Sequence, residues 1–284
     1  MMTAPVGAPT TAAHALIDVL GAAKDASRSL ATLTANVKNA ALEAIARELE
    51  GAVDRVLAAN ELDLANGREN GLSVGLLDRL RLDEARIAGL ARAVRDVIAL
   101  PDPVGTVVRG STLPNGVRLS QVRVPFGVVG AIYEARPNVT IDIAALALKS
   151  GNAAVLRGGS AAESTNRELV GLIQSALASV GLPVAAVQTI DPFGRAGATE
   201  LMRARGYVDV LIPRGSADLI QTVVRESTVP VIETGAGVVH IVLDASADET
   251  MAVEIVHNAK VQRPSVCNAV ETVLVHRDAA ARLL

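Results

Sequence analysis

The stretch FGVVGAIYEARPNVTIDIAALALKSGNAAVLRGGS, Phe126 to Ser160, decides the fold of this chain. It begins with an apolar run over Gly127–Tyr133, continues with a helical pattern over Ile141–Lys149, and returns to an apolar run over Ala153–Leu156. A short buried strand, a helix and a second buried strand in this order predict a βαβ unit with parallel strands.

The same alternation continues toward the C-terminus. Further strands are predicted at Ala186–Ile190, Val208–Ile212, Val229–Ile232 and Val238–Leu243, and further helices at Glu163–Val180, Thr199–Arg205 and Asp218–Arg225. Repeated βα units predict an α/β fold in which a parallel, Rossmann-type sheet carries helices on both faces. Such sheets bind ligands beyond the carboxyl ends of their strands, so those loops hold the candidate site residues.

The segment before the sheet predicts helices and an extended arm. Apolar residues recur at helical spacing from Leu16 to Ala23, from Leu42 to Val56 and from Ile87 to Val97. Between Val104 and Val124, two β-type runs flank Asn115-Gly116, a pair typical of hairpin turns. This β-hairpin arm is either a surface loop or, because its edges are unpaired, an oligomerisation element, and we expect a homo-oligomer.

Composition excludes several classes of function. The net charge of −3 argues against the basic face that nucleic-acid binding needs. With only two Phe and two Tyr, the chain also has few aromatic side chains on which bases could stack. No apolar run approaches the ~18 residues that cross a bilayer, and the start lacks a basic leader, so we expect no membrane and a cytoplasmic protein. Four His residues without ligand spacing and one Cys predict no metal site.

The single cysteine, Cys267, lies in NAKVQRPSVCNAVET. A lone thiol is either a small buried hydrophobe or a nucleophile. Lys260 and Arg263 bring positive charge, which favours the reactive thiolate. The local sequence alone leaves both interpretations open.

Polar residues and glycines follow four of the predicted strands. Asn138 is either a helix N-cap or an amide donor to a developing oxyanion, and Arg136 is either an ion-pair partner or an anion clamp. The runs Arg157-Gly158-Gly159-Ser160 and Arg214-Gly215-Ser216 are either simple βα turns or seats for the ribose and phosphate of a nucleotide. Glu233 ends a strand beside a glycine turn. No Walker loop or G-x-G-x-x-G fingerprint is present.

Together these loops resemble the aldehyde dehydrogenase superfamily. In that family an Asn after a strand supplies the oxyanion hole, a basic residue in a V-L-[KR] strand end holds the adenosine ribose, a G-S turn faces the pyrophosphate, and a Glu precedes the Cys nucleophile by a few dozen residues. The matching positions here are Asn138, Arg157, Gly215-Ser216, Glu233 and Cys267.

The resemblance implies a role for each candidate residue. It implies catalytic roles for Asn138, Glu233 and Cys267, and substrate contacts for Arg136 and Arg263. The implied cofactor-binding residues are Arg157, Gly158, Gly159, Ser160, Arg214, Gly215 and Ser216. The role of Glu233 stays open. Aldehyde dehydrogenases use this residue to activate the water that hydrolyses their thioester, whereas an enzyme that reduces an acyl phosphate and releases phosphate needs no such water.

Five motifs are similar to one branch of that superfamily: EARPNVT, LKSGNAAVLRGGS, DVLIPRG, VIETGAGVVHIVLD and QRPSVCNAVETVLVH. This resemblance covers the chain from about residue 12. It implies NADPH-dependent reduction of L-glutamyl 5-phosphate to L-glutamate 5-semialdehyde in proline biosynthesis, with a cysteine thioester and release of phosphate. The labile substrate suggests a glutamate 5-kinase as the partner that supplies it.

Cofactor choice depends on one position. NAD-preferring relatives place a carboxylate three residues after the basic residue, where it accepts from the ribose 2′-hydroxyl. Here Ser160 follows Arg157 at that position, and no carboxylate would repel a 2′-phosphate. We therefore expect NADP rather than NAD.

The resemblance divides the chain into an NADP-binding domain at 12–232, with the oligomerisation hairpin at 104–124, and the beginning of a second α/β catalytic domain at 233–284. Family members continue well past the cysteine, so we expect this chain to be C-terminally truncated relative to them. Two alternatives stay open: a phosphate-independent NAD(P) semialdehyde dehydrogenase, and an inactive fragment that only binds nucleotide or partner chains. The R-P-N and P-S-V-C motifs favour the reductase over the first alternative.

Overall fold

The computed structural model describes residues 11–233, 235, 237–264 and 266–284. The chain divides into two compact units, residues 1–233 and 234–284. Each unit has its own sheet, and each is described by itself.

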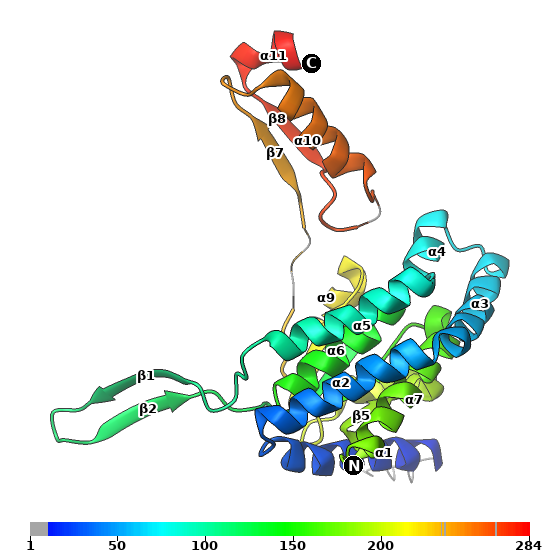
Figure 1. The fold of residues 1–284 in the computed structure, drawn as a ribbon, viewed down its shortest axis with the longest axis vertical. Coiled ribbons are helices and arrows are strands. Elements are labelled where there is room, and N and C mark those ends of the chain that lie inside the picture. Colours follow the sequence, from blue (N-terminus) through cyan, green and yellow to red (C-terminus); the bar gives the residue numbers. More distant parts are fainter. Residues whose placement is uncertain (1–10, 234, 236, 265) are drawn as a thin grey trace, which may run out of the picture. The chain divides into compact units, whose positions relative to one another are not determined.

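A four-stranded parallel sheet forms the centre of the first unit (Figure 1). In the spatial order β5-β4-β3-β6, its strands are β5 (Val187–Thr189), β4 (Ala153–Arg157), β3 (Val128–Tyr133) and β6 (Val210–Arg214). All six residues of β3 are buried, which requires cover on both faces of the sheet. The predicted α/β fold with a parallel Rossmann-type sheet is confirmed, and these four strands differ from their predicted ends by one or two residues.

Helices connect the strands in the expected order. They are α6 (Pro137–Lys149), α7 (Glu163–Ser179), α8 (Gly194–Arg203) and α9 (Ala217–Glu226). The short 3-10 turns η1 (Ser160–Ala162), η2 (Val184–Ala186) and η3 (Asp191–Phe193) lie between strands and helices. Right-handed crossovers place α6 and α7, which pack on each other, on one face of the sheet. The crossover from β5 to β6 runs the opposite way, so the same rule places α8 on the other face.

Five helices precede the sheet. They are α1 (Thr11–Leu30), α2 (Ala35–Gly51), α3 (Val53–Glu69), α4 (Val74–Leu80) and α5 (Glu84–Ala99). The helix α1 packs against β3, β4 and β5, while α2 and α5 pack on each other and on α6 (Figure 1). The predicted apolar stripes form this core, because Leu42, Ile45, Leu49 and Val94 are all buried. The buried carboxylate of Asp63 in α3 accepts from the backbone N–H of Thr165 at 2.8 Å, which fixes the start of α7.

The predicted arm is an antiparallel hairpin of β1 (Val107–Thr112) and β2 (Arg118–Val122). Gly116 in its turn has a φ of +86°, a conformation that glycine adopts without strain. Every residue of both strands is exposed. At the base of the arm, Asp102 pairs with the buried ammonium of Lys38 at 2.6 Å.

The second unit is a smaller α/β layer. It contains β7 (His240–Leu243), α10 (Glu249–Val261), β8 (Thr272–Val275) and α11 (Arg277–Leu283). The strands β7 and β8 run parallel, joined through α10. Asp248 caps α10 by accepting from the backbone N–H of Met251 at 2.8 Å.

One predicted strand is not a strand in the structure. At Val229–Ile232 the chain runs beside β6 but makes only an isolated bridge between Leu211 and Val231. Pro230 has no N–H to donate, and its carbonyl accepts from the backbone N–H of Leu211 at 2.8 Å. The segment therefore borders the sheet without forming a fifth strand.

Candidate functional site

The turns that follow β3, β4 and β6 meet at one edge of the sheet. A β-carbon built on Gly159 would lie 3.1 Å from the backbone nitrogen of Ala135. A β-carbon built on Gly215 would lie 2.7 Å from the Glu134 carboxylate. A side chain at Gly159 would require the backbone beside it to shift by a few tenths of an ångström, and one at Gly215 would require the Glu134 side chain to move. The two glycines therefore allow the turns to approach one another closely. The first unit thus brings together the two predicted cofactor runs, Arg157–Ser160 and Arg214–Ser216.

Glu134 ties two of these turns together. The backbone N–H and the hydroxyl of Ser216 donate to its carboxylate at 2.9 and 3.0 Å. Ser216 is also the N-cap of α9, since its Oγ accepts from the backbone N–H of Leu219 at 3.3 Å. A carboxylate is favoured at a helix N-terminus by the helix dipole. We did not predict this contact, although an acidic residue directly after a strand was a signal for it.

Asn138 lies in the first turn of α6. The helix begins at Pro137, four residues earlier than predicted, with Arg136 in the N-cap position. The interpretation of Asn138 as the N-cap is therefore wrong. Its side chain is exposed, and its Nδ2 donates to Oδ2 of Asp142 at 3.1 Å. The amide is thus presented at the surface and oriented by a carboxylate one turn later in the same helix.

Arg157 ends β4 and is half-buried. Its Nη1 donates to the carbonyl of Gly158, while its buried Nε has no hydrogen-bond partner among the described residues. A buried guanidinium nitrogen without a partner is costly unless a ligand satisfies it. Ser160, on which the predicted preference for NADP rests, is exposed.

A carboxylate that we did not predict lies under this turn. Oδ1 of Asp191 accepts from the backbone N–H of Gly158 at 2.7 Å, and its Oδ2 accepts from Asn166 at 3.2 Å. Burial raises the pKa of Asp191, although these hydrogen bonds and the charge of Arg157 act to lower it. Asp191 follows β5, so the rule of strand-end loops pointed to this position too.

A buried chain of hydrogen bonds continues from Asp191 into the core. Asn166 in α7 accepts from the Thr140 hydroxyl at 2.9 Å, and Thr140 in turn lies 2.6 Å from the Tyr133 hydroxyl. Burial raises the pKa of Tyr133, so this phenol stays protonated. These hydrogen bonds join β3, α6 and α7 and fix the positions of the residues beneath the strand-end turns.

Cys267 lies in the second unit, in the turn between α10 and β8. Its side chain is exposed, so the interpretation as a buried hydrophobe is wrong. A β-carbon built on Gly237 would lie 2.9 Å from the carbonyl oxygen of Cys267, so the Gly237 backbone supports this turn.

The basic residues near the cysteine differ in their surroundings. Arg263, four residues before the cysteine, is exposed. Lys260, predicted to supply charge, donates to the carbonyl of Val270 at 3.0 Å. Ser265 lies outside the described residues.

The predicted catalytic residues are divided between the units. Asn138 and Glu233 belong to the first and Cys267 to the second. Glu233 is exposed and lies at the very end of the first unit. Arg214 and Ser216 are exposed at the end of β6 and the start of α9.

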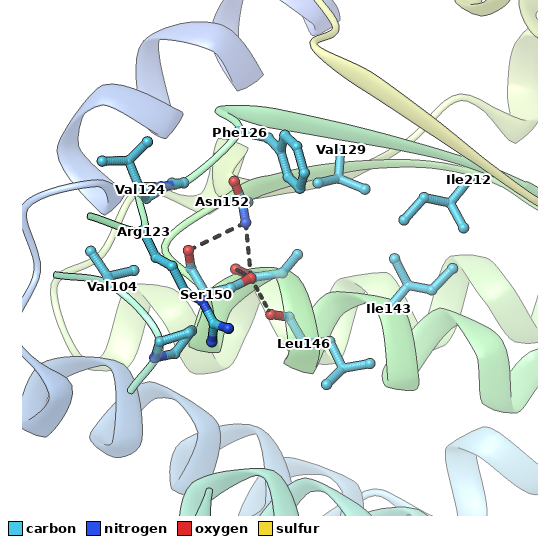
Figure 2. A pocket seen from close by; sticks show the side chains of 13 residues that line it. Val104, Arg123, Val124, Phe126, Val129, Ile143, Leu146, Ser150, Asn152 and Ile212 are labelled. Carbon is cyan, nitrogen blue, oxygen red and sulfur yellow. Dashed lines mark hydrogen bonds between the residues drawn. The ribbon is translucent and has the colours of Figure 1, made fainter. Parts of the chain in front are cut away.

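Figure 2 shows an apolar pocket of about 410 Å³ at the base of the hairpin arm. Phe126, Val129 and Ile212 face Ile143 and Leu146 of α6 across it. Among the described residues that line it there is no predicted site residue. It is therefore separate from the strand-end site.

The fold and these strand-end turns define a ligand-binding α/β protein of the doubly wound type. The aldehyde dehydrogenase family model matches residues 6–284, and the chain belongs to that family. It is 70% identical over 276 residues to a gamma-glutamyl phosphate reductase of Leifsonia xyli subsp. xyli, covering 97% of this chain and 66% of that protein. It is 62% identical to the gamma-glutamyl phosphate reductase of Kineococcus radiotolerans, again covering 66% of that protein.

Solved structures agree with the family. The gamma-glutamyl phosphate reductase of Thermotoga maritima matches with a TM-score of 0.86 at 42% identity, over 94% of this chain and 65% of that one. The Saccharomyces cerevisiae protein of the same name matches with a TM-score of 0.72 at 32% identity, over 96% of this chain and 67% of that one. The chain therefore spans about two thirds of the length of these relatives.

The family implies a nicotinamide dinucleotide, and the strand-end residues fit one. Among the described residues, the buried Nε of Arg157 has no hydrogen-bond acceptor. The runs Arg157–Ser160 and Arg214–Ser216 lie at the carboxyl ends of β4 and β6, which is where open α/β sheets bind dinucleotides. Within the parts of the chain that the structure covers, no helix is long and apolar enough to span a membrane, and no group of His, Cys, Asp and Glu could hold a metal ion.

Proposed function

We propose that this chain carries out the chemistry of an acyl-phosphate reductase, converting L-glutamyl 5-phosphate to L-glutamate 5-semialdehyde with NADPH and releasing phosphate. The observation that carries the proposal is a single exposed cysteine in a chain that is 62–70% identical to curated gamma-glutamyl phosphate reductases. The gamma-glutamyl phosphate reductase names of those relatives give the substrate class.

The protein's own groups have separate tasks in this reaction. The Cys267 thiolate attacks the acyl carbon, the C–S bond forms, and the bond to the phosphate oxygen breaks to give a thioester. The amide of Asn138 and the backbone N–H of Cys267 stabilise the oxyanion that develops on the way. NADPH held by Arg157–Ser160 and Arg214–Ser216 would supply the hydride that reduces the thioester. The thiolate is then expelled as the semialdehyde forms.

The proposed seat of the cofactor is the edge formed by Arg157–Ser160 and Arg214–Ser216. NADP is favoured over NAD because Ser160 leaves no carboxylate beside the 2′-phosphate, and Arg157 supplies a cation. Asp191 contacts this turn, and its carboxylate oxygens accept hydrogen bonds from Gly158 and Asn166. It therefore braces the turn, and Arg157 remains available to the phosphate.

Substitution of the cysteine tests the proposal. Wild-type protein should reduce NADP⁺ in the presence of glutamate 5-semialdehyde and phosphate, and it should do so faster than it reduces NAD⁺. Cys267→Ala should abolish this rate, while thermal unfolding stays unchanged because the side chain is exposed. A Cys267→Ala protein with near-normal rate would rule out the thioester route, and a preference for NAD⁺ would overturn the assigned cofactor.

A further inference from the structure

One polar stripe interrupts the apolar surface of α6. Asp142 is the only ionisable residue between Pro137 and Leu148. It lies one turn after Asn138 and one turn before the exposed Leu146, so the three side chains share one face of the helix. The core does not cover this face, since Asn138 is exposed and Asp142 is only half-buried.

The surroundings of Asp142 favour a positively charged ligand. Burial raises its pKa, although the hydrogen bond from Asn138 and the charge of Arg214 act to lower it. Among the described residues its carboxylate shows a hydrogen bond to a neutral amide and no ion pair. A partly desolvated carboxylate without an ion-pair partner gains free energy when a cationic group binds beside it.

We infer that Asp142 selects substrates that carry an ammonium group, by pairing with the α-ammonium of the glutamyl chain while Asn138 serves the acyl end. This inference rests on the proposed function. Nδ2 of Asn138 lies 3.1 Å from Oδ2 of Asp142, so the two groups are presented side by side. The four bonds from the acyl carbon to the amino nitrogen of the substrate span about 5 Å when extended. With hydrogen bonds of about 3 Å at each end, one glutamyl chain can meet both groups at once.

The pairing has a chemical consequence for the substrate. A neutral α-amine attacks its own activated acyl carbon and closes a five-membered ring, which expels the phosphate or the thiolate. An ammonium group has no lone pair, so it cannot make this attack. Asp142 stabilises the ammonium form and thereby preserves the open chain for reduction.

A competing role for Asp142 is to orient the Asn138 amide and nothing more. Asp142→Asn separates the two roles, because the new amide oxygen still accepts from Asn138 while the negative charge is lost. Asp96→Asn is the matched control, since Asp96 is exposed on α5 in the same unit. The substrates compared are glutamate 5-semialdehyde and glutarate semialdehyde, which lacks only the amino group.

With NADP⁺ and phosphate, wild-type protein should prefer the amino substrate. In Asp142→Asn, kcat/KM for glutamate 5-semialdehyde should fall about 10- to 100-fold, the worth of one charge-assisted hydrogen bond. The value for glutarate semialdehyde should not change, and Asp96→Asn should match wild type with both substrates.

Other outcomes overturn the inference in distinguishable ways. An equal fall with both substrates would mean that Asp142 only orients Asn138. No change with either, or a wild type that is indifferent to the amino group, would mean that Asp142 does not select the substrate. If wild type turns over neither semialdehyde, the proposed function fails, and this inference fails with it.

Discussion

Gly237 shows how one residue without a side chain supports the cysteine. Its α-carbon approaches so closely that an added β-carbon would lie 2.9 Å from the carbonyl oxygen of Cys267. Gly237→Ala must therefore displace the cysteine turn, because the obstacle is backbone and not a flexible side chain. Gly235 offers the matched control, since none of the residues that the structure describes lies within 4 Å of its added β-carbon.

We predict that Gly237→Ala lowers kcat by at least about 10-fold, because small misplacements of a nucleophile are costly. Gly235→Ala should keep the wild-type rate. Steady-state kinetics with glutamate 5-semialdehyde measure both, and the rate at which a thiol reagent modifies the single cysteine reports on the turn independently. Equal rates for the two variants would show that the close approach does not position Cys267.

Asp102 offers a prediction with a defined pH dependence. Burial acts to raise its pKa, but the hydrogen bonds from Lys38 and from the Val104 N–H, with the charges of Lys38 and Lys149, prevail and lower it below the ordinary value. A carboxylate with a lowered pKa stabilises the fold above the pKa of the unfolded chain, near 3.9. That stabilisation is lost as the pH falls through the folded-state pKa.

Asp102→Asn should lower the free energy of unfolding at pH 7 by about 3 kcal/mol, because Lys38 is left as a buried, unpaired charge. Wild type and variant should converge as the pH falls below about 4. Urea unfolding across this pH range measures the difference, with exposed Asp96→Asn as the control. A difference that stays constant down to pH 3 would show that the charge of Asp102 is not its source.

At the scale of elements, the hairpin arm is the clearest case of a structure that needs a partner. Both strands are exposed throughout, and their exposed residues include Val107, Val108, Leu119 and Val122. A two-stranded ribbon with open edges and apolar side chains is unfavourable in water by itself. We propose that it pairs with a second copy of this chain.

Replacement of residues 107–122 by a short Gly-Ser linker should lower the mass of the protein in solution to that of a monomer. The ion pair between Asp102 and Lys38 lies outside the deleted segment, so the thermal unfolding of the first unit should change little. Light scattering coupled to size exclusion measures the mass. A wild-type protein that is monomeric at every concentration would contradict the role assigned to the arm.

The order of helices and strands was predictable, because the spacing of apolar residues and the position of glycines in turns depend directly on local structure. The start of α6 was misplaced because the apolar pattern begins at Ile141, whereas Pro137 fits the first helical position. The apolar residues of Val229–Ile232 predict a strand, but Pro230 cannot donate to a ladder, and only an isolated bridge forms. Both errors come from weighing hydrophobicity above backbone hydrogen bonding.

The candidate site was only partly predictable. Residues in recognisable loops, such as Asn138, Arg157 and Cys267, were found from the sequence and await functional tests. Their partners were not, because Glu134 meets Ser216 across 82 positions of sequence, and Asp191 meets Gly158 across 33. Such contacts depend on which strands are neighbours, and the sequence pattern fixes strand order only in general terms.

For the whole molecule, we propose that a chain about two thirds as long as its reductase relatives carries out phosphate-dependent chemistry at Cys267. The most direct test is NADP⁺ reduction by glutamate 5-semialdehyde in phosphate buffer and in phosphate-free buffer, beside Cys267→Ala. We predict sustained turnover that requires both phosphate and Cys267, because phosphate must attack the thioester to regenerate the thiolate. Equal turnover without phosphate, or turnover by Cys267→Ala, would contradict the claim.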